Sequence, residues 1–533
     1  MTTTDVIVIG GGHNGLTCAA YLASTGLKVT VLERRGVVGG AAVTEEFHPG
    51  FRNSVASYTV SLLNPKVIRD LDLPRHGLKV VERRMSNFLP LEGDHFFVGE
   101  GRTKAEVARF SQKDADQLDA YGERLDRIAD VLREIVLETP PNLVEGGFAE
   151  ALPELLKSAS LGRRLSKLDL TAKRDLLALF SQSAGDWLDG WFESDPIKAA
   201  YGFDGVVGAY ASPYTPGTAY VLLHHVFGEV NGKKGAWGHA VGGMGAISQA
   251  MAACCRERGV EIRTDVEVAE VLTEKGRAVG VVTAGGETLR ASRAVVSNIH
   301  PQLLFQKLVD PGVQPADFRE RIDRYKSGSG TFRMNVALSE LPRFTVAPDA
   351  GDHMTAGIIM APTLAYMDRA FMDARTHGWS KEPIVEMLIA STLDDGLAPA
   401  GRHVASLFCQ HVAPDLGPGR SWDDHREEVA DLMIATVDRH APGFAASVLG
   451  RQVLSPLDLE RKLGLVGGDI FHGRLTLDQL FSARPVLGAG DHRTPVKALY
   501  QCGAGTHPGG GVTGAPGHNA AREVLKDVKR RRV

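Results

Sequence analysis

The stretch Asp5-Val6-Ile7-Val8-Ile9-Gly10-Gly11-Gly12-His13-Asn14-Gly15 stands near the start of the chain, and Lys28-Val29-Thr30-Val31-Leu32-Glu33 follows after a run of small and apolar residues. The pattern predicts a buried strand, a glycine turn, a helix that ends near Gly26, and a second strand. Such glycines let the backbone approach a pyrophosphate, which sits on the free N–H groups of a helix N-terminus. Glu33 comes about twenty residues later, where a carboxylate accepts hydrogen bonds from ribose hydroxyls. These residues therefore predict an adenine dinucleotide site.

A second glycine pair, Gly39-Gly40, follows Glu33, Arg34 and Arg35, and most nicotinamide-binding domains lack such a pair. A flavin dinucleotide extends its isoalloxazine ring far from the adenine, so a second close backbone approach near the pyrophosphate favours FAD. A glycine-rich turn alone is weak evidence because such turns are common. Here the strand, glycines, helix, second strand and terminal Glu33 occur in register, which makes a cofactor site the better interpretation.

Length and composition exclude several classes of protein. A chain of 533 residues suggests two or three domains. A net charge of −4 and a pI near 6.5 disfavour a nucleic-acid partner. The cysteines are scattered and show neither a Cys-x-x-Cys pair nor metal-ligand spacing, so we expect no metal and a reducing compartment. Neither a signal-peptide pattern nor a long apolar run is apparent, which favours a cytoplasmic protein.

Hydrophobic periodicity divides the chain. From about residue 103 to residue 198, apolar residues recur at spacings of three and four, which predicts an inserted helical region. They include Leu118, Tyr121, Leu125, Ile128, Leu132 and Val136.

The charge-poor stretch from Ser54 to Leu63 is a candidate wall of a substrate cavity. We expect an FAD-binding domain from residues 1–75, 235–300 and 486–533, and a discontinuous substrate domain from 76–234 and 301–485.

Two segments mix leucines or valine with basic residues. Residues 152–168 could rest on a membrane surface as an amphipathic helix, but a solvated helix that packs its leucines inward is the favoured interpretation. The basic tail 526–532 has the same two interpretations. Peripheral contact with a membrane therefore stands as the alternative to a purely cytoplasmic protein.

A middle glycine cluster, Gly242-Gly243-Met244-Gly245, precedes a predicted helix (246–258) and strand (260–263). A second dinucleotide site, for NAD(P)H, is one interpretation. It is disfavoured because the residues before the glycines do not form an apolar parallel strand and no carboxylate or arginine cluster ends the following strand. A close backbone approach to the flavin side of the cavity is the favoured interpretation.

Near the other end stands Leu499-Tyr500-Gln501-Cys502-Gly503-Ala504-Gly505-Thr506-His507-Pro508-Gly509-Gly510-Gly511-Val512-Thr513-Gly514-Ala515-Pro516. It predicts a buried strand, a glycine loop and a helix with Pro516 in its first turn. A reduced flavin carries negative charge at its N1–C2=O edge, which the N–H groups of a helix N-terminus can hold. So many glycines cost conformational entropy, which points to close backbone contact with the ring.

Together these motifs resemble the phytoene desaturase-type branch of the FAD-dependent amine oxidase superfamily, and most closely the pyridine nucleotide-disulfide oxidoreductase domain-containing protein 2 group. The likeness runs nearly end to end. It implies an α/β (α+β overall) fold, with a Rossmann-type FAD-binding domain of the glutathione reductase or amine oxidase kind. The position after Gly39-Gly40, often arginine in carotenoid desaturases and amine oxidases, is Ala41. The FAD contacts predicted from the motifs and the resemblance are Gly10, Gly12, His13, Asn14, Gly15, Glu33, Arg34, Gly39, Gly40, Ala41, Val266, Gly505, Gly510, Gly511, Val512 and Thr513.

The chemistry that the resemblance implies is hydride transfer between an apolar, isoprenoid-like substrate carbon and flavin N5, giving desaturation, saturation or isomerisation of an alkene. The electron acceptor would be a quinone or dioxygen. An acid–base residue would handle the second proton, and the candidates are Tyr58, His225, Trp237 and His507. The alternatives are a flavin amine oxidase and a flavin-binding interaction protein without catalytic activity. The oligomeric state is left open.

Overall fold

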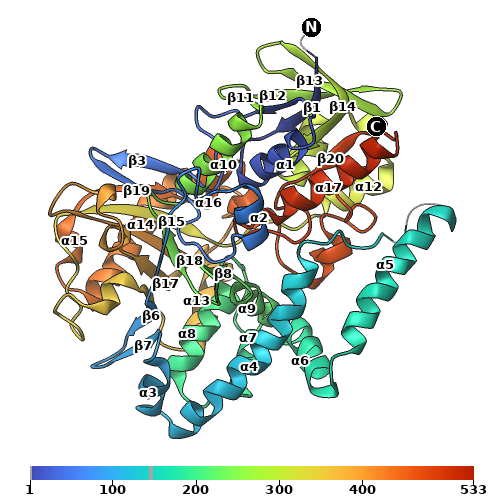
Figure 1. Ribbon diagram of the computed structural model, residues 1–533. Coiled ribbons are helices and arrows are strands. Elements are labelled where there is room, and N and C mark those ends of the chain that lie inside the picture. The colour runs from blue at the N-terminus through green and yellow to red at the C-terminus, as the bar shows by residue number, and fades with distance from the viewer. Residues whose placement is uncertain (1–2, 143, 145–147) are drawn as a thin grey trace.

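Two sheets form the framework of the part of the chain that the structure describes, residues 3–142, 144 and 148–533 of a computed structural model (Figure 1). Each sheet has seven strands. The first lies near the two ends of the chain, which are close together in the upper part of Figure 1. The expected α/β (α+β overall) fold class is confirmed.

The first sheet has the strand order β11-β2-β1-β14-β13-β12, with β20 also paired to β14. The pairs that involve β1, β2, β11 and β20 are parallel, and β12, β13 and β14 pair antiparallel. The side chains of Val6, Ile7 and Val8 are fully buried, as is typical of a strand covered on both faces. The strands are β1 (Thr3–Ile9), β2 (Val29–Leu32), β11 (Glu261–Arg263), β12 (Val268–Glu274), β13 (Arg277–Thr283), β14 (Thr288–Ser297) and β20 (Leu499–Gln501).

Three helices far apart in sequence pack together beside this sheet. Helix α1 (His13–Ala23) contacts both α10 (Gly245–Glu257) and α17 (Ala515–Lys529). Small residues such as Ala19 and Ala20 are completely buried there and allow the close packing. The N-terminal glycine turn and the C-terminal glycine loop, more than four hundred residues apart, therefore lie on one side of one sheet (Figure 1).

The second sheet has the order β19-β15-β18-β17-β16-β6-β7 and is antiparallel except between β16 and β6. Helix α13 (Leu364–His377) packs on β17 and β18, and α14 (Trp422–His440) packs on β17. The strands are β6 (Met85–Pro90), β7 (His95–Gly99), β15 (Phe332–Leu338), β16 (Gly357–Met360), β17 (Trp379–Leu388), β18 (His403–Val412) and β19 (Val448–Leu454).

A helical layer occupies the middle of the chain. Helix α4 buries the apolar stripe that its periodicity predicts, including Tyr121, Leu125, Ile128 and Leu132. Ser111 caps its N-terminus by accepting a hydrogen bond from Asp114 N. The helices are α3 (Thr103–Ala108), α4 (Gln112–Ile135), α5 (Phe148–Ser166), α6 (Leu170–Ser181), α7 (Ala184–Asp189), α8 (Asp195–Val206) and α9 (Thr218–Val226).

Helix α5 runs along the outer edge of the molecule (Figure 1). Leu152 and Leu155 are half exposed and Leu156 is 65% exposed, so the prediction that the leucines of this segment pack inward is wrong for these three. Within residues 3–142, 144 and 148–533, no helix is both long enough and apolar enough to cross a bilayer.

Shorter elements connect the two sheets. A hairpin follows the glycine pair, and β5 pairs with β10 rather than with the first sheet. These elements are β3 (Thr44–His48), β4 (Phe51–Ser54), α2 (Pro65–Asp70), β5 (Val80–Glu82), β8 (Glu229–Val230), β9 (Lys233–Lys234), β10 (Gly238–Ala240), α11 (Pro301–Leu303), α12 (Ala316–Asp323), α15 (Phe444–Ser447) and α16 (Pro456–Leu463).

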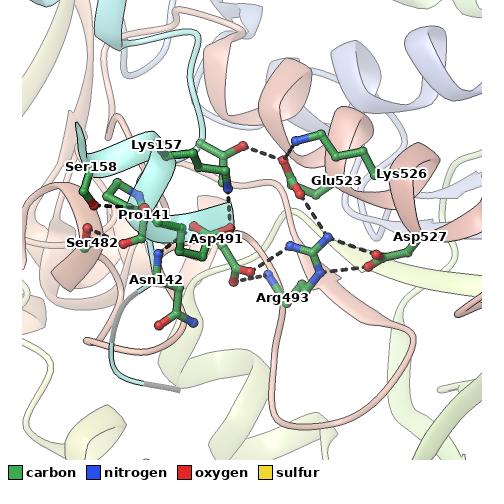
Figure 2. Close-up of polar contacts among 12 residues, drawn as sticks. Pro141, Asn142, Lys157, Ser158, Ser482, Asp491, Arg493, Glu523, Lys526 and Asp527 are labelled. Carbon is green, nitrogen blue, oxygen red and sulfur yellow. Dashed lines mark hydrogen bonds and ion pairs between the residues drawn. The ribbon is translucent and has the colours of Figure 1, made fainter. Parts of the chain in front are cut away.

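An ion-pair network fixes the C-terminal helix α17, as Figure 2 shows. Arg493 contacts Asp491, Glu523 and Asp527 at 2.7, 2.9 and 2.8 Å. Glu523 also accepts hydrogen bonds from Lys526 and from Thr139, the latter at 2.8 Å. Because Glu523 and Asp527 are almost completely buried, these contacts hold α17, and with it the glycine loop that precedes it, in one position.

Candidate functional site

The turn between β1 and α1 brings backbone to the surface of a large cavity. Gly10, Gly12, His13 and Asn14 line it. Gly15 does not, because it faces the strand: a Cβ there would lie 2.2 Å from the Gly10 carbonyl oxygen. Gly15 therefore permits α1 to pack on β1. The start of α1 lines the cavity, and the free N–H groups of a helix N-terminus suit a pyrophosphate.

Glu33 lies at the end of β2 and is 6% exposed. Its Oε2 accepts a hydrogen bond from Gly11 N at 2.8 Å, and its Oε1 accepts one from Arg35 N at 2.9 Å. It also lines the cavity. A carboxylate oxygen can accept more than one hydrogen bond, so Glu33 can hold ribose hydroxyls while it braces the glycine turn.

The second glycine pair closes on the first turn. Gly39 N donates to the Gly11 carbonyl at 2.9 Å, and Gly12 and Gly39 form an isolated parallel bridge. Gly39, Gly40 and the following Ala41 line the cavity beside the turn. The backbone therefore approaches the cofactor position from two sides.

The C-terminal glycine loop borders the same cavity farther from the first turn, where Gly510, Gly511 and Val512 line it. Gly511 has a φ of +111°, and a Cβ there would lie 2.5 Å from Leu62 Cδ1. Gly514 caps α17, whose first turn contains no acidic residue. A helix N-terminus without carboxylates suits the negative charge of a reduced flavin.

Two histidines beside the first turn carry buried nitrogens without a protein partner, namely His13 Nε2 and His472 Nδ1. Both residues line the cavity. Burial lowers the pKa of His13 to about 3 and that of His472 to about 4, so both rings are neutral at neutral pH. Unsatisfied buried polar atoms are costly unless a ligand pairs with them, and an FAD molecule along this wall would supply that partner. The residues fit the cofactor.

Arg484, which the sequence analysis missed, organises the wall that carries His472. Its side chain is completely buried and donates to the carbonyls of Phe471 and Ala504, at 2.7 and 2.8 Å, among others. The segment that contains Phe471 and His472 is thereby joined to the start of the glycine loop. An arginine in a loop rich in glycine and proline gives no sequence signal of such a role.

Beyond the glycine loop the cavity continues between the helical layer and the second sheet. We call this part the substrate chamber. Its walls combine aromatic and aliphatic side chains with ionisable groups and with polar residues such as Thr59, Ser86 and Asn87. The stretch from Ser54 to Leu63 contributes to them as predicted. The lining residues that define the chamber are Tyr58, Arg83, Phe203, Asp204, Val207, His225, Trp237, Glu386, Phe408, Ile470 and Phe471.

The ionisable groups of the chamber are buried together. The Tyr58 hydroxyl donates to Glu386 Oε2, and burial raises the pKa of both residues above their ordinary values. Burial, with a smaller contribution from Glu386, raises the pKa of Asp204 to about 8. The Arg333 guanidinium lies 4.5 Å from the centre of the Tyr58 ring. Perturbed groups of this kind in a cavity are typical of functional sites.

Arg83, Asp204 and Glu386 were not among the predicted site residues, although two of them carry a signal. Glu386 stands alone in the apolar run Ile384-Val385-Glu386-Met387-Leu388, and Asp204 stands alone between Phe203 and Val206 in an otherwise uncharged stretch. A carboxylate placed where a strand or helix is otherwise apolar is expensive to bury, so it indicates a function.

The four predicted catalytic candidates lie in different places. Tyr58, His225 and Trp237 line the substrate chamber, and the His225 and Trp237 rings stack with centroids 6.2 Å apart. His225 Nδ1 contacts the Val221 carbonyl at 2.9 Å. His507 does not line the cavity: it packs on Phe481, and its Nε2 lies 3.4 Å from the Ile135 carbonyl. We assign His507 a packing role.

The predicted cofactor residues lie mainly along the cavity, and three do not line it. Gly15 faces β1, Gly505 packs on Pro301, and Thr513 Oγ1 accepts a hydrogen bond from Ala515 N at the start of α17. Those that line the cavity are Gly10, Gly12, His13, Asn14, Glu33, Arg34, Gly39, Gly40, Ala41, Val266, Gly510, Gly511 and Val512.

The middle glycine cluster lies away from the cavity. Gly242 and Gly243 do not line the cavity, so the predicted backbone approach to the flavin side is wrong. A Cβ at Gly243 would lie 2.4 Å from Thr44 Oγ1, and Gly242 N donates to Asp394 at 2.6 Å. The glycines permit α10 to pack on the hairpin that follows Gly39-Gly40.

Comparison with known proteins gives a consistent result. The family model described as "Flavin containing amine oxidoreductase" matches residues 15–332. A rat (Rattus norvegicus) protein named "Pyridine nucleotide-disulfide oxidoreductase domain-containing protein 2" is 42% identical, covering 98% of this chain and 94% of its own. A protein of Castellaniella defragrans, named as one of the subunits of limonene dehydrogenase, is 26% identical, covering 98% of this chain and 95% of its own.

Among solved structures, wild-type putrescine oxidase bound to putrescine has the same fold, with a TM-score of 0.60 and 16% identity over 99% of each chain. At this identity the likeness concerns the fold alone.

Proposed function

Because the chain belongs to the flavin-containing amine oxidoreductase family and is an FAD-dependent oxidoreductase, we propose that it dehydrogenates a carbon–carbon bond of a largely apolar, isoprenoid-like substrate. Bound FAD supplies hydride transfer at flavin N5. The reverse reaction, saturation, and an alkene isomerisation use the same arrangement. Reoxidation by a quinone or dioxygen completes the proposed cycle.

The observation that carries the proposal is the continuity of the cofactor site with the substrate chamber. One cavity runs from Gly10 and Glu33, past Gly511, to Phe203 and Phe408. The aromatic and aliphatic walls would hold an apolar carbon skeleton and exclude water from it. The similar protein from Castellaniella defragrans, named as part of a limonene dehydrogenase, supports a substrate of this class.

Dehydrogenation of a carbon–carbon bond removes a proton as well as a hydride, so the chamber needs a proton acceptor. Two groups suit this role. Glu386 accepts a hydrogen bond from the Tyr58 hydroxyl, and the raised pKa of Tyr58 keeps that hydroxyl protonated. His225 is the second, because burial lowers the pKa of its imidazole and keeps it neutral, and its Nδ1 is held by the Val221 carbonyl.

A flavin amine oxidase is the second candidate, because Tyr58 and Trp237 present two aromatic rings to the chamber. Such enzymes often place a lysine beside the flavin ring. Among the described residues that line the cavity, the only lysine is Lys307, which lies with Val266 at the adenosine end. The lining therefore supports carbon–carbon dehydrogenation better.

Anaerobic mixing of the FAD-loaded protein with substrate panels tests the proposal. We expect isoprenoid alkenes or their saturated counterparts to bleach the visible absorption of the flavin, and primary amines to leave it unchanged. Bleaching by amines alone would establish the second candidate instead. Rapid bleaching by NADPH alone would require a nicotinamide site, and no bleaching by any panel would favour a flavin-binding protein without catalytic activity.

A further inference from the structure

We propose that the substrate carries one carboxylate and that Arg83, in the wall of the substrate chamber, binds it. This inference rests on the proposed function and narrows its substrate class: an apolar skeleton with a single acidic group. Arg83 follows β5, and its backbone N donates to the Trp237 carbonyl at 2.9 Å, which fixes the start of its side chain.

The Arg83 side chain is buried with most of its hydrogen-bonding capacity unused. The residue is 8% exposed and lines the cavity. Nη2 donates to Thr59 Oγ1 at 3.2 Å, whereas Nε and Nη1 are buried and find no acceptor in the protein. The guanidinium carbon lies 5.5 Å from the centre of the Trp237 ring. This cation–π contact replaces only part of the hydration that a buried guanidinium loses.

Arg83 has no ion pair within 4.0 Å among the described residues; Glu386 and Asp204 act on its charge only from a greater distance. Glu386 and Asp204 line the same chamber but are engaged otherwise. Glu386 accepts the Tyr58 hydroxyl, and a pKa of about 8 keeps Asp204 mostly protonated at neutral pH. A buried arginine without an ion-pair partner points to a missing anion.

A second buried arginine increases the positive charge. Arg333 is 1% exposed and lies behind Tyr58; its Nη2 donates to Ser406 Oγ at 2.5 Å, and its Nε and Nη1 have no acceptor. Two permanent cations, Arg83 and Arg333, therefore share the neighbouring Glu386 carboxyl group, and burial raises the pKa of that group. A ligand with a negative charge would offset the positive charge of this cluster.

A ligand carboxylate meets these requirements. It supplies a single negative charge and accepts charge-assisted hydrogen bonds from a guanidinium, which are stronger than those between neutral groups. Aromatic and aliphatic side chains such as Phe203, Phe408 and Ile470 line the chamber as well, so the ligand also needs an apolar portion. Anchoring at Arg83 would fix which bond of the skeleton faces the flavin loop.

The test uses the FAD-loaded protein and three probes of one chain length: decanoate, decan-1-ol and methyl decanoate. Binding is measured by isothermal titration calorimetry and by the change in the visible spectrum of the bound flavin. We expect decanoate to bind at least about tenfold more tightly than either neutral probe, since a hydrogen bond to a charged group is at stake. Equal affinity for all three probes would overturn the inference.

Variants locate the effect. Arg83→Met should weaken decanoate binding about 10- to 100-fold and leave decan-1-ol binding within about twofold, and Arg83→Lys should give an intermediate affinity. Arg324→Met, at the exposed arginine that follows α12, is the matched control and should behave as the unmodified protein. If Arg83→Met binds decanoate normally, or loses FAD instead, the site is not Arg83. Should Arg83→Met fail to fold, the three-probe comparison on the unmodified protein decides.

The two proposals fail separately. If the protein binds decanoate through Arg83 but no alkene, acid or saturated counterpart bleaches its flavin, the anion site stands and the proposed dehydrogenation is refuted. If neutral isoprenoids bleach the flavin and the protein shows no preference for a carboxylate, the dehydrogenation stands and the anion site is refuted.

Discussion

Replacement of Glu33 by alanine should weaken FAD binding and also lower the stability of the FAD-free protein. Glu33 accepts hydrogen bonds from Gly11 N at 2.8 Å and Arg35 N at 2.9 Å, and it lines the cavity where the ribose would lie. Alanine therefore removes the ribose acceptor and leaves the Gly11 N–H, in a buried turn, without a partner.

The two effects have separate magnitudes. A hydrogen bond from a ribose hydroxyl to a buried carboxylate is worth about 1.5–3 kcal/mol, which raises the Kd for FAD about 10- to 150-fold. The unpaired Gly11 N–H lowers the free energy of unfolding of the FAD-free protein by about 1–3 kcal/mol. The Arg35 N–H is only partly buried, so water can replace its acceptor at little cost.

FAD titration of the cofactor-free protein, followed by quenching of flavin fluorescence, measures the first effect, and urea unfolding measures the second. Glu270→Ala is the matched control, because Glu270 is an exposed glutamate on β12 of the same sheet. Glu33→Gln should fall between alanine and the unmodified protein. An unchanged Kd in Glu33→Ala, with FAD still bound, would refute the ribose contact.

Three further predictions concern Asp204, Glu523 and Gly511. Decanoate binding should weaken as pH rises through about 8, because Asp204 then ionises beside Arg83 and Glu386. Calorimetry on Asp204→Asn should show a decanoate affinity that does not change over the same pH range. A pH dependence that persists in this variant would contradict the assignment. Burial disfavours ionised Glu523, but Arg493 and other donors outweigh it and lower its pKa to about 2, so Glu523→Gln should cost about 3 kcal/mol of unfolding free energy at neutral pH. That difference should shrink as pH falls below the ordinary value of 4.5 toward 2, as chemical unfolding at several pH values would show; a difference independent of pH would contradict it. Gly511→Ala, which places a Cβ against Leu62 at a positive φ, should cost about 1–3 kcal/mol and lower FAD occupancy, measured by absorbance; full occupancy would contradict close approach of the loop.

The cofactor end of the molecule could be predicted from the sequence because its signals are local. The strand, glycine turn, helix and Glu33 lie within about thirty residues, and each element constrains the next. The C-terminal glycine loop is similarly compact. The family prediction rested on these same motifs and is confirmed.

The substrate chamber could not be assembled in the same way. Arg83, Asp204 and Glu386 come from three segments more than a hundred residues apart, and only the packing of α8 against the second sheet brings them together. His507 shows the opposite error: it adjoins the glycine loop in sequence, but its ring points to Phe481 rather than to the cavity. Sequence neighbours of a loop can face either side of it, and local patterns do not distinguish the sides.

Product analysis after a single anaerobic turnover tests the central claim most directly. The FAD-loaded protein is mixed with a saturated isoprenoid acid in slight excess, and the recovered acid is examined by mass spectrometry. Our account predicts that the flavin bleaches while the acid loses two hydrogens, keeps every heavy atom and gains one carbon–carbon double bond. Bleaching by a primary amine with release of ammonia, and none by the acid, would contradict it.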